Sequence, residues 1–493
     1  MQHIIAIDIG TTHIKASIVN ERAEVLFSLL NDVDTIKNIE GVYEQDAERI
    51  FQSFISLLKN CLKEINENDI ACISFSAAMH SILAIDKNNN PLTNAITWAD
   101  TRAAKQAAAL RNTSIGNDIY LHTGTPIHAM SPLCKLLWIK DEMPSVFAKA
   151  ARFISIKEYI FYRLFGKYII DEGIASATGL YDFENKKWYA PALSLCSINE
   201  NHLSTIVQAT HAETEMIQTI KDELSLQKNI PFIIGGSDGG LANIGCGALQ
   251  KDTAVITLGT SGAARVSLHA SEKFNGNGLF RYAVVDDLHI CGGPVNNGGI
   301  VLQWFAENFL SEEEKGDNFF NAVMFMAQQS VAGSNGLIFL PYLLGERAPV
   351  WNENASGVFF NINITHNKND FARAVVEGIS FSLFHVLQTM DEAGIQTDRV
   401  MATGIITKNE WWMQLFADIC GRPVSLTGTE DASSMGAAYL GMYAMRIIKN
   451  FDDINVFNQS IKTFIPNKNN YTLYQKTFAK YKSLYTKLAD EFV

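Results

Sequence analysis

The sequence lacks both a long hydrophobic run and a surplus of basic charge, and each absence removes a class of function. No apolar stretch approaches the ~20 residues that a membrane-spanning helix needs, and no basic segment precedes an apolar core near the N-terminus. Lys and Arg number 40 against 52 Asp and Glu, a formal net charge of −12, whereas nucleic-acid binding needs a basic face. We therefore expect a cytoplasmic protein with neither a membrane nor a nucleic-acid partner.

Paired cysteines and two familiar nucleotide-binding signatures are also missing. The 7 cysteines are scattered without a C-x-x-C pair, and their odd number fits reduced thiols better than a zinc site or a disulfide framework. No stretch reads G-x-x-x-x-G-K-[ST], and no G-x-G-x-x-G opens a strand–helix unit. A phosphate site in this chain must therefore be formed by another kind of turn.

A short phrase is present twice, at residues 6–12 and at residues 256–261. A tight turn of glycine and small hydroxyl residues directs backbone N–H groups and hydroxyls toward one point, which suits an anion. Either copy alone is also explained as an ordinary hairpin, but the repetition favours a polyphosphate held between two related domains. In each copy an apolar β-run breaks at such a turn: Gly10, Thr11 and Thr12 in the first, and Gly259, Thr260 and Ser261 in the second.

The order of predicted elements supports two α/β domains. The chain has 493 residues, of which 47% are apolar, so it can form two full cores. A strand meander, a helix and a further strand open the chain, and a similar order with insertions follows residue 250. We place the boundary at residue 247, giving domains 1–247 and 248–493. The predicted strands are 3–9, 14–20, 24–30 and 70–76, and the predicted helices are 51–65, 301–310 and 474–488, the last packing on the second domain.

Asp238 lies in a glycine cluster, residues 235–240, directly after the apolar run 230–234. Glycines leave the backbone around a carboxylate open to close approach by a substrate. Phosphoryl transfer to an alcohol needs a base beside the hydroxyl, and Asp238 is the candidate. Capping of the helix that follows is the alternative role for an Asp–Gly pair, and the two roles are compatible.

Asp8 ends the first predicted strand beside the first turn. A carboxylate buried there needs a partner or a cation, and Mg²⁺, which keeps several of its waters, is the natural cation. A hydrogen-bonded structural Asp is the alternative. Lys15, on the strand that leaves the turn, either reaches a phosphate or points into solvent.

Longer segments carry a family resemblance over nearly the whole chain. Residues 130–142 read MSPLCKLLWIKDE, and residues 357–362 read GVFFNI, followed by 370–371 and 374–377. These segments resemble the two signatures of the FGGY carbohydrate kinases, with Asn361 in place of a glycine. The resemblance implies two ribonuclease-H-like domains, of the actin, hexokinase and Hsp70 type, that close over ATP and a sugar. Four further segments are similar to the gluconate kinases in particular: 74–81, 97–102, 123–128 and 292–299.

The resemblance implies ATP-dependent transfer to D-gluconate, with Mg²⁺ as cofactor and Asp238 taking the proton of the sugar's terminal hydroxyl. Arg102 is suited to bidentate contact with the C1 carboxylate, and Arg347 is a further candidate for that contact. The implied sugar-binding residues are Met79, His80, Trp98, Asp100, Arg102, His128 and Asp238. The implied nucleotide-binding residues are Gly10, Thr11, Thr12, Lys15, Gly259, Thr260, Ser261, Gly404, Ile405, Asn409 and Gly436, with Asp8 facing the metal.

Some alternatives stay open. Ile405 and Ile406 stand where the family has small residues, and a β-branched side chain blocks close approach to a phosphate. A family kinase of a neutral sugar such as xylulose is one alternative, and a sugar-binding protein without transfer activity is another, opposed by the presence of Asp8 and Asp238. The small residues 433–438 either close the nucleotide pocket or serve tight helix packing. A homodimer is also left open.

Overall fold

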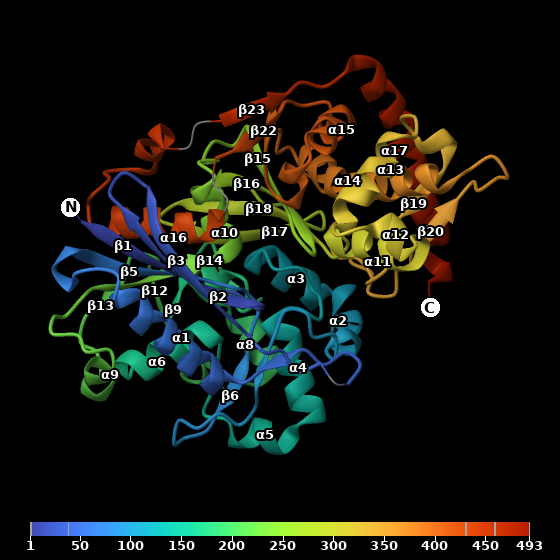
Figure 1. The fold of residues 1–493 in the computed structure, drawn as a ribbon. Coiled ribbons are helices and arrows are strands. Elements are labelled where there is room, and N and C mark those ends of the chain that lie inside the picture. Colours follow the sequence, from blue (N-terminus) through green and yellow to red (C-terminus); the bar gives the residue numbers. More distant parts are fainter. Residues whose placement is uncertain (1, 38, 429–430, 458–459, 493) are drawn as a thin grey trace.

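A computed structural model describes residues 2–37, 39–428, 431–457 and 460–492, and its two large sheets divide the chain into two halves (Figure 1). The N-terminal sheet has the order β13-β14-β5-β1-β2-β3, and the C-terminal sheet has the order β17-β18-β16-β15-β21-β22-β23. The N-terminal strands are β1 His3–Ile9, β2 His13–Asn20, β3 Val25–Asp32, β5 Ile70–Ala77, β13 Ala212–Glu213 and β14 Phe232–Ser237. The C-terminal strands are β15 Thr253–Leu258, β16 Gly262–His269, β17 Phe280–Val285, β18 Leu288–Val295, β21 Arg399–Gly404, β22 Val424–Thr427 and β23 Ser460–Phe464.

Helices flank each sheet, as expected for an α/β chain. The helices of the N-terminal half are α1 Ala47–Leu62, α2 Ala104–Arg111, α3 Ser114–Thr123, α4 Pro132–Glu142, α5 Pro144–Lys149, α6 Ile156–Phe165, α7 Glu172–Ser176, α8 Ala190–Cys196, α9 Gln218–Glu223 and α10 Asp238–Gly245. Those of the C-terminal half are α11 Gly299–Phe309, α12 Glu312–Lys315, α13 Phe319–Gln328, α14 Lys368–Glu392, α15 Glu410–Cys420, α16 Ala432–Ala444 and α17 Lys468–Leu488. In the described part of the chain no helix combines the length and apolarity that crossing a membrane requires.

The two sheets repeat one pattern, as the repeated phrase indicated. In the first, β2 lies antiparallel between β1 and β3, while β5 and β14 continue parallel to β1. In the second, β16 lies antiparallel between β15 and β18, while β21 and β22 continue parallel to β15. The predicted strand meander and the strand 70–76 are confirmed, and the predicted helix 51–65 ends at Leu62. Each half therefore has its own sheet and its own apolar core.

The C-terminal helix α17 packs on the second half, as its spacing predicted. Tyr474 and Tyr481 are fully buried, and Tyr481 shares a hydrogen bond of 2.8 Å with Tyr342. Tyr474 donates to Glu377 on α14 at 2.8 Å. The seven cysteines are all buried and unpaired.

Helices α10 and α16 join the halves and lie side by side at their junction (Figure 1). Each follows the last parallel strand of its own sheet, and α16 packs on β1 and β5 of the other half. A Cβ on Gly436 would lie 1.9 Å from the Leu241 carbonyl oxygen, and one on Gly245 would lie 1.9 Å from that of Ala432. Only residues without a side chain allow this backbone contact.

One departure from the family signature has a local explanation. Asn361, which replaces a glycine, has φ +70° in the turn after β20 (Val358–Phe360). Asn is among the non-glycine residues that best tolerate this left-handed region. The replacement therefore keeps the turn conformation.

Candidate active site

A cavity of about 330 Å³ lies between the two halves and brings the two turns together. Thr11 and Thr12 contribute from the first turn, and Thr257 and residues 259–263 contribute from the second. The sequence-predicted residues that line the cavity are Thr11, Thr12, Met79, His80, Trp98, Asp238, Gly259, Thr260 and Ser261. Most of the predicted acceptor and phosphate residues thus share one space.

The two turns are closed hairpins with similar internal bonds. Gly10 N donates to the His13 carbonyl at 2.9 Å, and Gly259 N donates to the Ser261 carbonyl at 2.8 Å. The second turn is also braced from behind, because Gly299 N at the start of α11 donates to the Gly259 carbonyl at 2.8 Å. Both turns are therefore held in shape, with small hydroxyl side chains at the cavity wall.

Asp238 begins α10 at the end of β14, where the strand is irregular. Gly235 has φ +74°, and a Cβ there would lie 1.6 Å from the Phe75 carbonyl oxygen, so only glycine fits. Ser237, not Asp238, caps the helix, since its hydroxyl accepts from Gly240 N at 3.2 Å. The capping role considered for Asp238 thus belongs to its neighbour.

The Asp238 carboxylate is free for other contacts. Its Oδ1 accepts from Gly239 N at 2.7 Å. Burial raises the pKa of Asp238, while the positive charges of Arg265 and Lys157 oppose the rise. Lys157 is itself buried, pairs with Asp171 at 2.5 Å and donates to the Gly236 carbonyl at 3.2 Å, which holds the backbone just before the aspartate.

Asp8 at the end of β1 has a carboxylate with one free oxygen. Ser433 on α16 donates to Oδ2 at 2.9 Å, whereas Oδ1 is buried and has no hydrogen-bond partner among the described residues. Burial, together with the charges of the nearby Asp238 and Asp431, raises the pKa of Asp8 to about 6. No group of three metal-ligating side chains is present in the described ranges. The Oδ1 of Asp8, without a partner among the described residues, is a feature that fits Mg²⁺, which is commonly bound by one or two carboxylates, waters and substrate phosphates.

Lys15 forms an ion pair that the sequence did not predict, and its contact with a phosphate stays a prediction. Its Nζ lies 2.6 Å from Asp431, the residue that caps α16. Because β2 belongs to the first half and α16 to the second, this ion pair spans the junction. Lys15 is not part of the cavity wall.

Arg102 is engaged by carboxylates of its own half. Its Nη2 lies 2.8 Å from Asp100 and 2.5 Å from Glu44, and its guanidinium stacks 4.4 Å from the Trp138 ring centre. Asp100 is 2% exposed and also accepts from Tyr43 N at 2.9 Å. Neither Asp100 nor Arg102 lines the cavity. A guanidinium neutralised in this way is poorly suited to bind a further carboxylate.

The two predicted histidines are uncharged. Burial lowers the pKa of His80 to about 3 and that of His128 well below its ordinary value. His80 lines the cavity with φ +69°, a strained conformation of the kind found at functional sites, and its Nδ1 bonds the Ala177 carbonyl at 2.8 Å. His128 lies outside the wall, with Nε2 3.4 Å from Glu353. His80 thus offers a neutral ring to a polar ligand.

Arg347 is a positively charged residue on the cavity wall, beside Trp98. It is 7% exposed and lines the cavity, its guanidinium lies 4.9 Å from the Trp98 ring centre, and Nη2 donates to the Val295 carbonyl at 3.3 Å. Its Nε has no partner among the described residues. Burial lowers the pKa of Arg347 to about 10, so the group remains charged at neutral pH.

The cavity residues that the sequence reasoning did not single out include Arg265, Phe280 and Tyr282. Arg265 lies two residues after Ala263 on β16, so both side chains face the same side of the sheet. The available signal for Arg265 was a charged residue on a strand whose neighbouring residues are buried. Phe280 and Tyr282 stack 4.4 Å apart on β17 and give the cavity an aromatic wall.

The predicted residues of the adenosine side lie outside the cavity, around the end of β21. A Cβ on Gly404 would lie 2.1 Å from the Leu258 carbonyl oxygen, and Asn409 caps α15. Ile406 is fully buried in the core, whereas Ile405 is partly exposed, with its Cδ1 2.7 Å from where a Cβ of Gly299 would be. Gly436 is explained by the helix contact described above. Nucleotide contacts of these residues stay a prediction.

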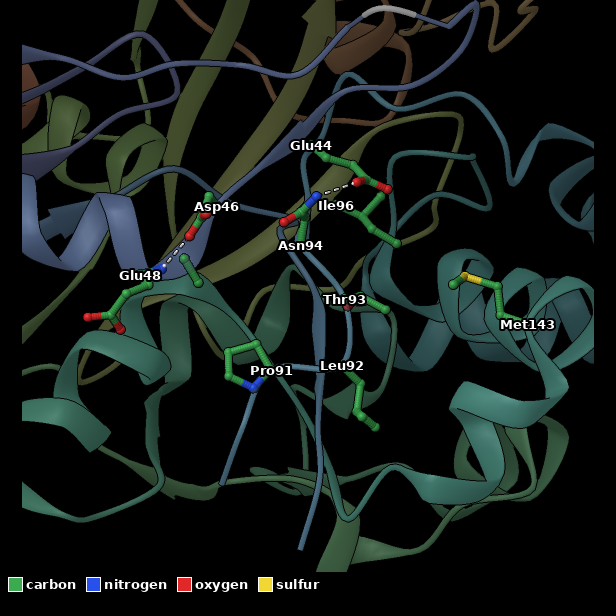
Figure 2. Close-up of a pocket in the computed structure, with 10 residues that line it drawn as sticks. Glu44, Asp46, Glu48, Pro91, Leu92, Thr93, Asn94, Ile96 and Met143 are labelled. Carbon is green, nitrogen blue, oxygen red and sulfur yellow. Dashed lines mark hydrogen bonds between the residues drawn. The ribbon is translucent and has the colours of Figure 1, made fainter. Parts of the chain in front are cut away.

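A second pocket, in the N-terminal half, has three acidic residues among those that line it: Glu44, Asp46 and Glu48 (Figure 2). Glu44 accepts from Asn94 at 2.9 Å and also binds Arg102, while Asp46 caps α1 through Glu48 N at 2.9 Å (Figure 2). Glu48 in turn binds Tyr159 and Arg163. The acidic groups of this pocket are therefore engaged in holding the local structure.

Comparison with known proteins agrees with the geometry. Residues 3–245 match the FGGY family of carbohydrate kinases, N-terminal domain, and residues 254–445 match the C-terminal domain of that family. A gluconokinase from Bacillus subtilis (strain 168) is 39% identical over 464 residues, covering 92% of this chain and 90% of that protein.

Two solved structures from Lactobacillus acidophilus extend the comparison. A ligand-bound xylulose kinase has a TM-score of 0.95 and 33% identity, and a gluconate kinase has a TM-score of 0.94 and 32% identity. Each pair covers 100% of this chain and 99% of the other. These matches confirm the expected α/β fold of two ribonuclease-H-like domains, of the actin type. The chain therefore belongs to the FGGY family of carbohydrate kinases and is a sugar kinase that uses ATP.

Proposed function

We propose that this kinase phosphorylates D-gluconate at its C6 hydroxyl, with Asp238 as the general base. The observation that carries the choice of a sugar acid is Arg347, a buried guanidinium on the cavity wall whose Nε has no partner in the part of the chain that the structure describes. A buried, incompletely bonded cation is costly unless a ligand completes its bonds. A carboxylate is the ligand that matches a guanidinium in charge and in shape. The 39% identity to a gluconokinase supports the same choice.

The proposed orientation of gluconate follows from the residues at the two ends of the cavity. The C1 carboxylate lies at Arg347, beside the Trp98 ring, and the C6 hydroxyl lies at Asp238. Asp238 accepts the hydroxyl proton as the C6 oxygen attacks the γ-phosphorus in line, and the bond to the β–γ bridging oxygen breaks. His80, held neutral by burial, bonds a sugar hydroxyl without competing for the carboxylate.

The phosphates of ATP lie between the two hairpins in this proposal. Backbone N–H groups and the hydroxyls of Thr12 and Thr260 surround the β- and γ-phosphates. Mg²⁺ would be held by Asp8, through its unpaired Oδ1, and would neutralise phosphate charge. The N-terminal domain, 1–247, thus supplies the base and most of the sugar site, and the C-terminal domain, 248–493, supplies the nucleotide site.

A comparison of matched acceptors tests the proposal. D-glucitol differs from gluconate only in having a neutral CH₂OH at C1, so the ratio of the two kcat/KM values measures recognition of the acid. We expect gluconate to exceed glucitol by about 10- to 150-fold, the equivalent of a charge-assisted hydrogen bond of 1.5–3 kcal/mol. Arg347→Met should abolish that preference, whereas Arg102→Met should leave it intact. A preference that survives in Arg347→Met would contradict the assignment.

A neutral ketose is the second candidate, because the xylulose kinase structure matches this chain as well as the gluconate kinase structure does. Measuring ADP release with D-xylulose under the same conditions separates the two. Higher kcat/KM on xylulose than on gluconate would overturn the proposal and assign the chain to the ketose kinases.

A further inference from the structure

Arg265 lines the cavity but has no part in the reaction as described so far. It lies on β16, the strand that leaves the second hairpin, and is partly exposed to the cavity. Its Nη1 donates to Thr257 Oγ1 at 3.1 Å, and this is the hydrogen bond that fixes the guanidinium in the described part of the chain. The remaining N–H groups of the guanidinium are left for a ligand.

The guanidinium lies against the backbone that carries Asp238. A Cβ on Gly239 would lie 3.1 Å from Arg265 Nε and 3.6 Å from Cζ, so the bare backbone of Gly239 makes room for the arginine. Thr257, its anchor, stands two residues before Gly259 of the second hairpin. Arg265 therefore lies between the carboxylate of the base and the turn that faces the phosphates.

We propose that Arg265 is a catalytic residue that contacts the transferring phosphoryl group. This inference rests on the proposed function for the placement of the acceptor hydroxyl at Asp238. As the C6 oxygen forms its bond to the γ-phosphorus and the β–γ bridging bond breaks, negative charge is spread over the three equatorial oxygens. Arg265 donates N–H groups to those oxygens, while the hydroxyl proton passes to Asp238 and ADP leaves with the bonding electrons.

The position suits this role for an electrostatic reason. A cation fixed by Thr257 before the reaction needs no reorganisation when charge develops, and such groups give the largest effects where water is excluded. Arginines that face a transferring phosphoryl group accelerate transfer by 10³–10⁵-fold in other nucleotide enzymes. Arg347, at the Trp98 end of the cavity, is the separate cation for the C1 acid, so the two arginines have distinct tasks.

Three variants of the full-length protein test the assignment: Arg265→Met, which removes the charge at similar length, Arg265→Lys, which keeps the charge, and Arg265→Ala, which leaves room for added guanidinium. Arg399→Met serves as the matched control, because Arg399 begins β21, at the opposite end of that strand from Gly404 and the second hairpin, and pairs with Asp252 at 2.7 Å. Steady-state kcat and KM are measured with Mg-ATP, and gluconate affinity is measured by calorimetry without nucleotide.

We expect Arg265→Met to lower kcat by about 10²- to 10³-fold, while the calorimetric affinity for gluconate changes less than about threefold. Arg265→Lys should recover part of kcat, and added guanidinium should raise the kcat of Arg265→Ala. The control should match the wild type. Should Arg265→Met fail to fold, as judged by thermal unfolding, the Lys and Ala variants decide alone.

Loss of gluconate affinity with kcat retained would overturn the inference and show that Arg265 is a second residue that binds the gluconate carboxylate. An unchanged kcat, or the absence of any guanidinium rescue, would overturn it as well. Failure of the proposed function is distinguishable from these results. If the wild type prefers another sugar, the same kcat ratio is measured on that sugar, and the role of Arg265 is judged from it.

Discussion

Asp238→Asn is the sharpest test of the proposed chemistry, because it removes one proton acceptor and little else. The amide oxygen of Asn can still accept the bond that Gly239 N gives to Oδ1 at 2.7 Å, and Ser237 still caps α10. General base catalysis contributes about 10²- to 10⁴-fold. We therefore expect kcat to fall by that factor, which corresponds to about 3–5 kcal/mol in activation free energy.

The same substitution should not weaken the fold. Burial raises the pKa of Asp238 above its ordinary value, so the folded state holds the proton more tightly than the unfolded state does. A carboxyl group with a raised pKa costs stability once the pH exceeds its unfolded pKa, and this cost persists at neutral pH. Replacing it by a neutral amide should leave the melting temperature equal or higher at pH 7, and lower it relative to the wild type only in acid.

The assay follows ADP release at saturating gluconate and Mg-ATP, with gluconate affinity measured separately by calorimetry. Asp252→Asn, a change of a carboxylate on the surface of the second half, provides the control. A variant with near-normal kcat would refute the reasoning, since some other group would then accept the proton. Loss of gluconate affinity together with the fold would show instead that Asp238 is structural.

Three further predictions address the surroundings of the site. Gly436→Ala should destabilise the protein by about 1–3 kcal/mol or more, because the new Cβ would lie 1.9 Å from a carbonyl oxygen of α10, whereas Gly428→Ala, with 3.7 Å to its nearest atom, should be close to neutral in thermal unfolding. Ile405→Gly should lower the KM for ATP if its branched side chain, which lies against Gly299 of α11, obstructs the phosphates, and an unchanged KM would mean that the loop leaves them free. The apparent affinity for Mg²⁺ should weaken about tenfold per pH unit below about 6, because a proton competes for Asp8, and titration of activity with Mg²⁺ at several pH values measures this.

The local features of the site were predictable from the sequence, and the long-range pairings were not. Both hairpins, the strand before Asp238 and the helix after it follow from patterns within a few residues. The engagement of Arg102 depends on Glu44, which is 58 residues away. Such a partner has no signature in the local sequence, so an arginine suited to bind a carboxylate was assigned to the substrate when the protein already supplies two.

Arg265 contrasts with Arg102, because the sequence reasoning did not assign it to the site although it lines the cavity. Its neighbours on β16 are mostly small or apolar, but only the pairing of the two halves brings the strand over the Asp238 backbone. Lys15 is similar, because its partner Asp431 lies on a helix of the other half. Of these two charges the sequence analysis named only Lys15, and the partners of both depended on how the two domains meet.

The repeated arrangement of the two halves explains why both Lys15 and Arg265 are present. In each half the last parallel strand of the sheet is followed by a helix, α10 or α16, with an aspartate at its N-terminus. In each half the hairpin is followed by a strand that carries a cation. The packing of α10 against α16 places each aspartate beside the cation of the other half: Asp431 pairs with Lys15 at 2.6 Å, and Asp238 feels the charge of Arg265. In the first pair both charges are satisfied and the contact braces the junction. In the second pair both groups line the cavity, and in our proposal this asymmetry within a symmetric arrangement is why that pair serves phosphoryl transfer.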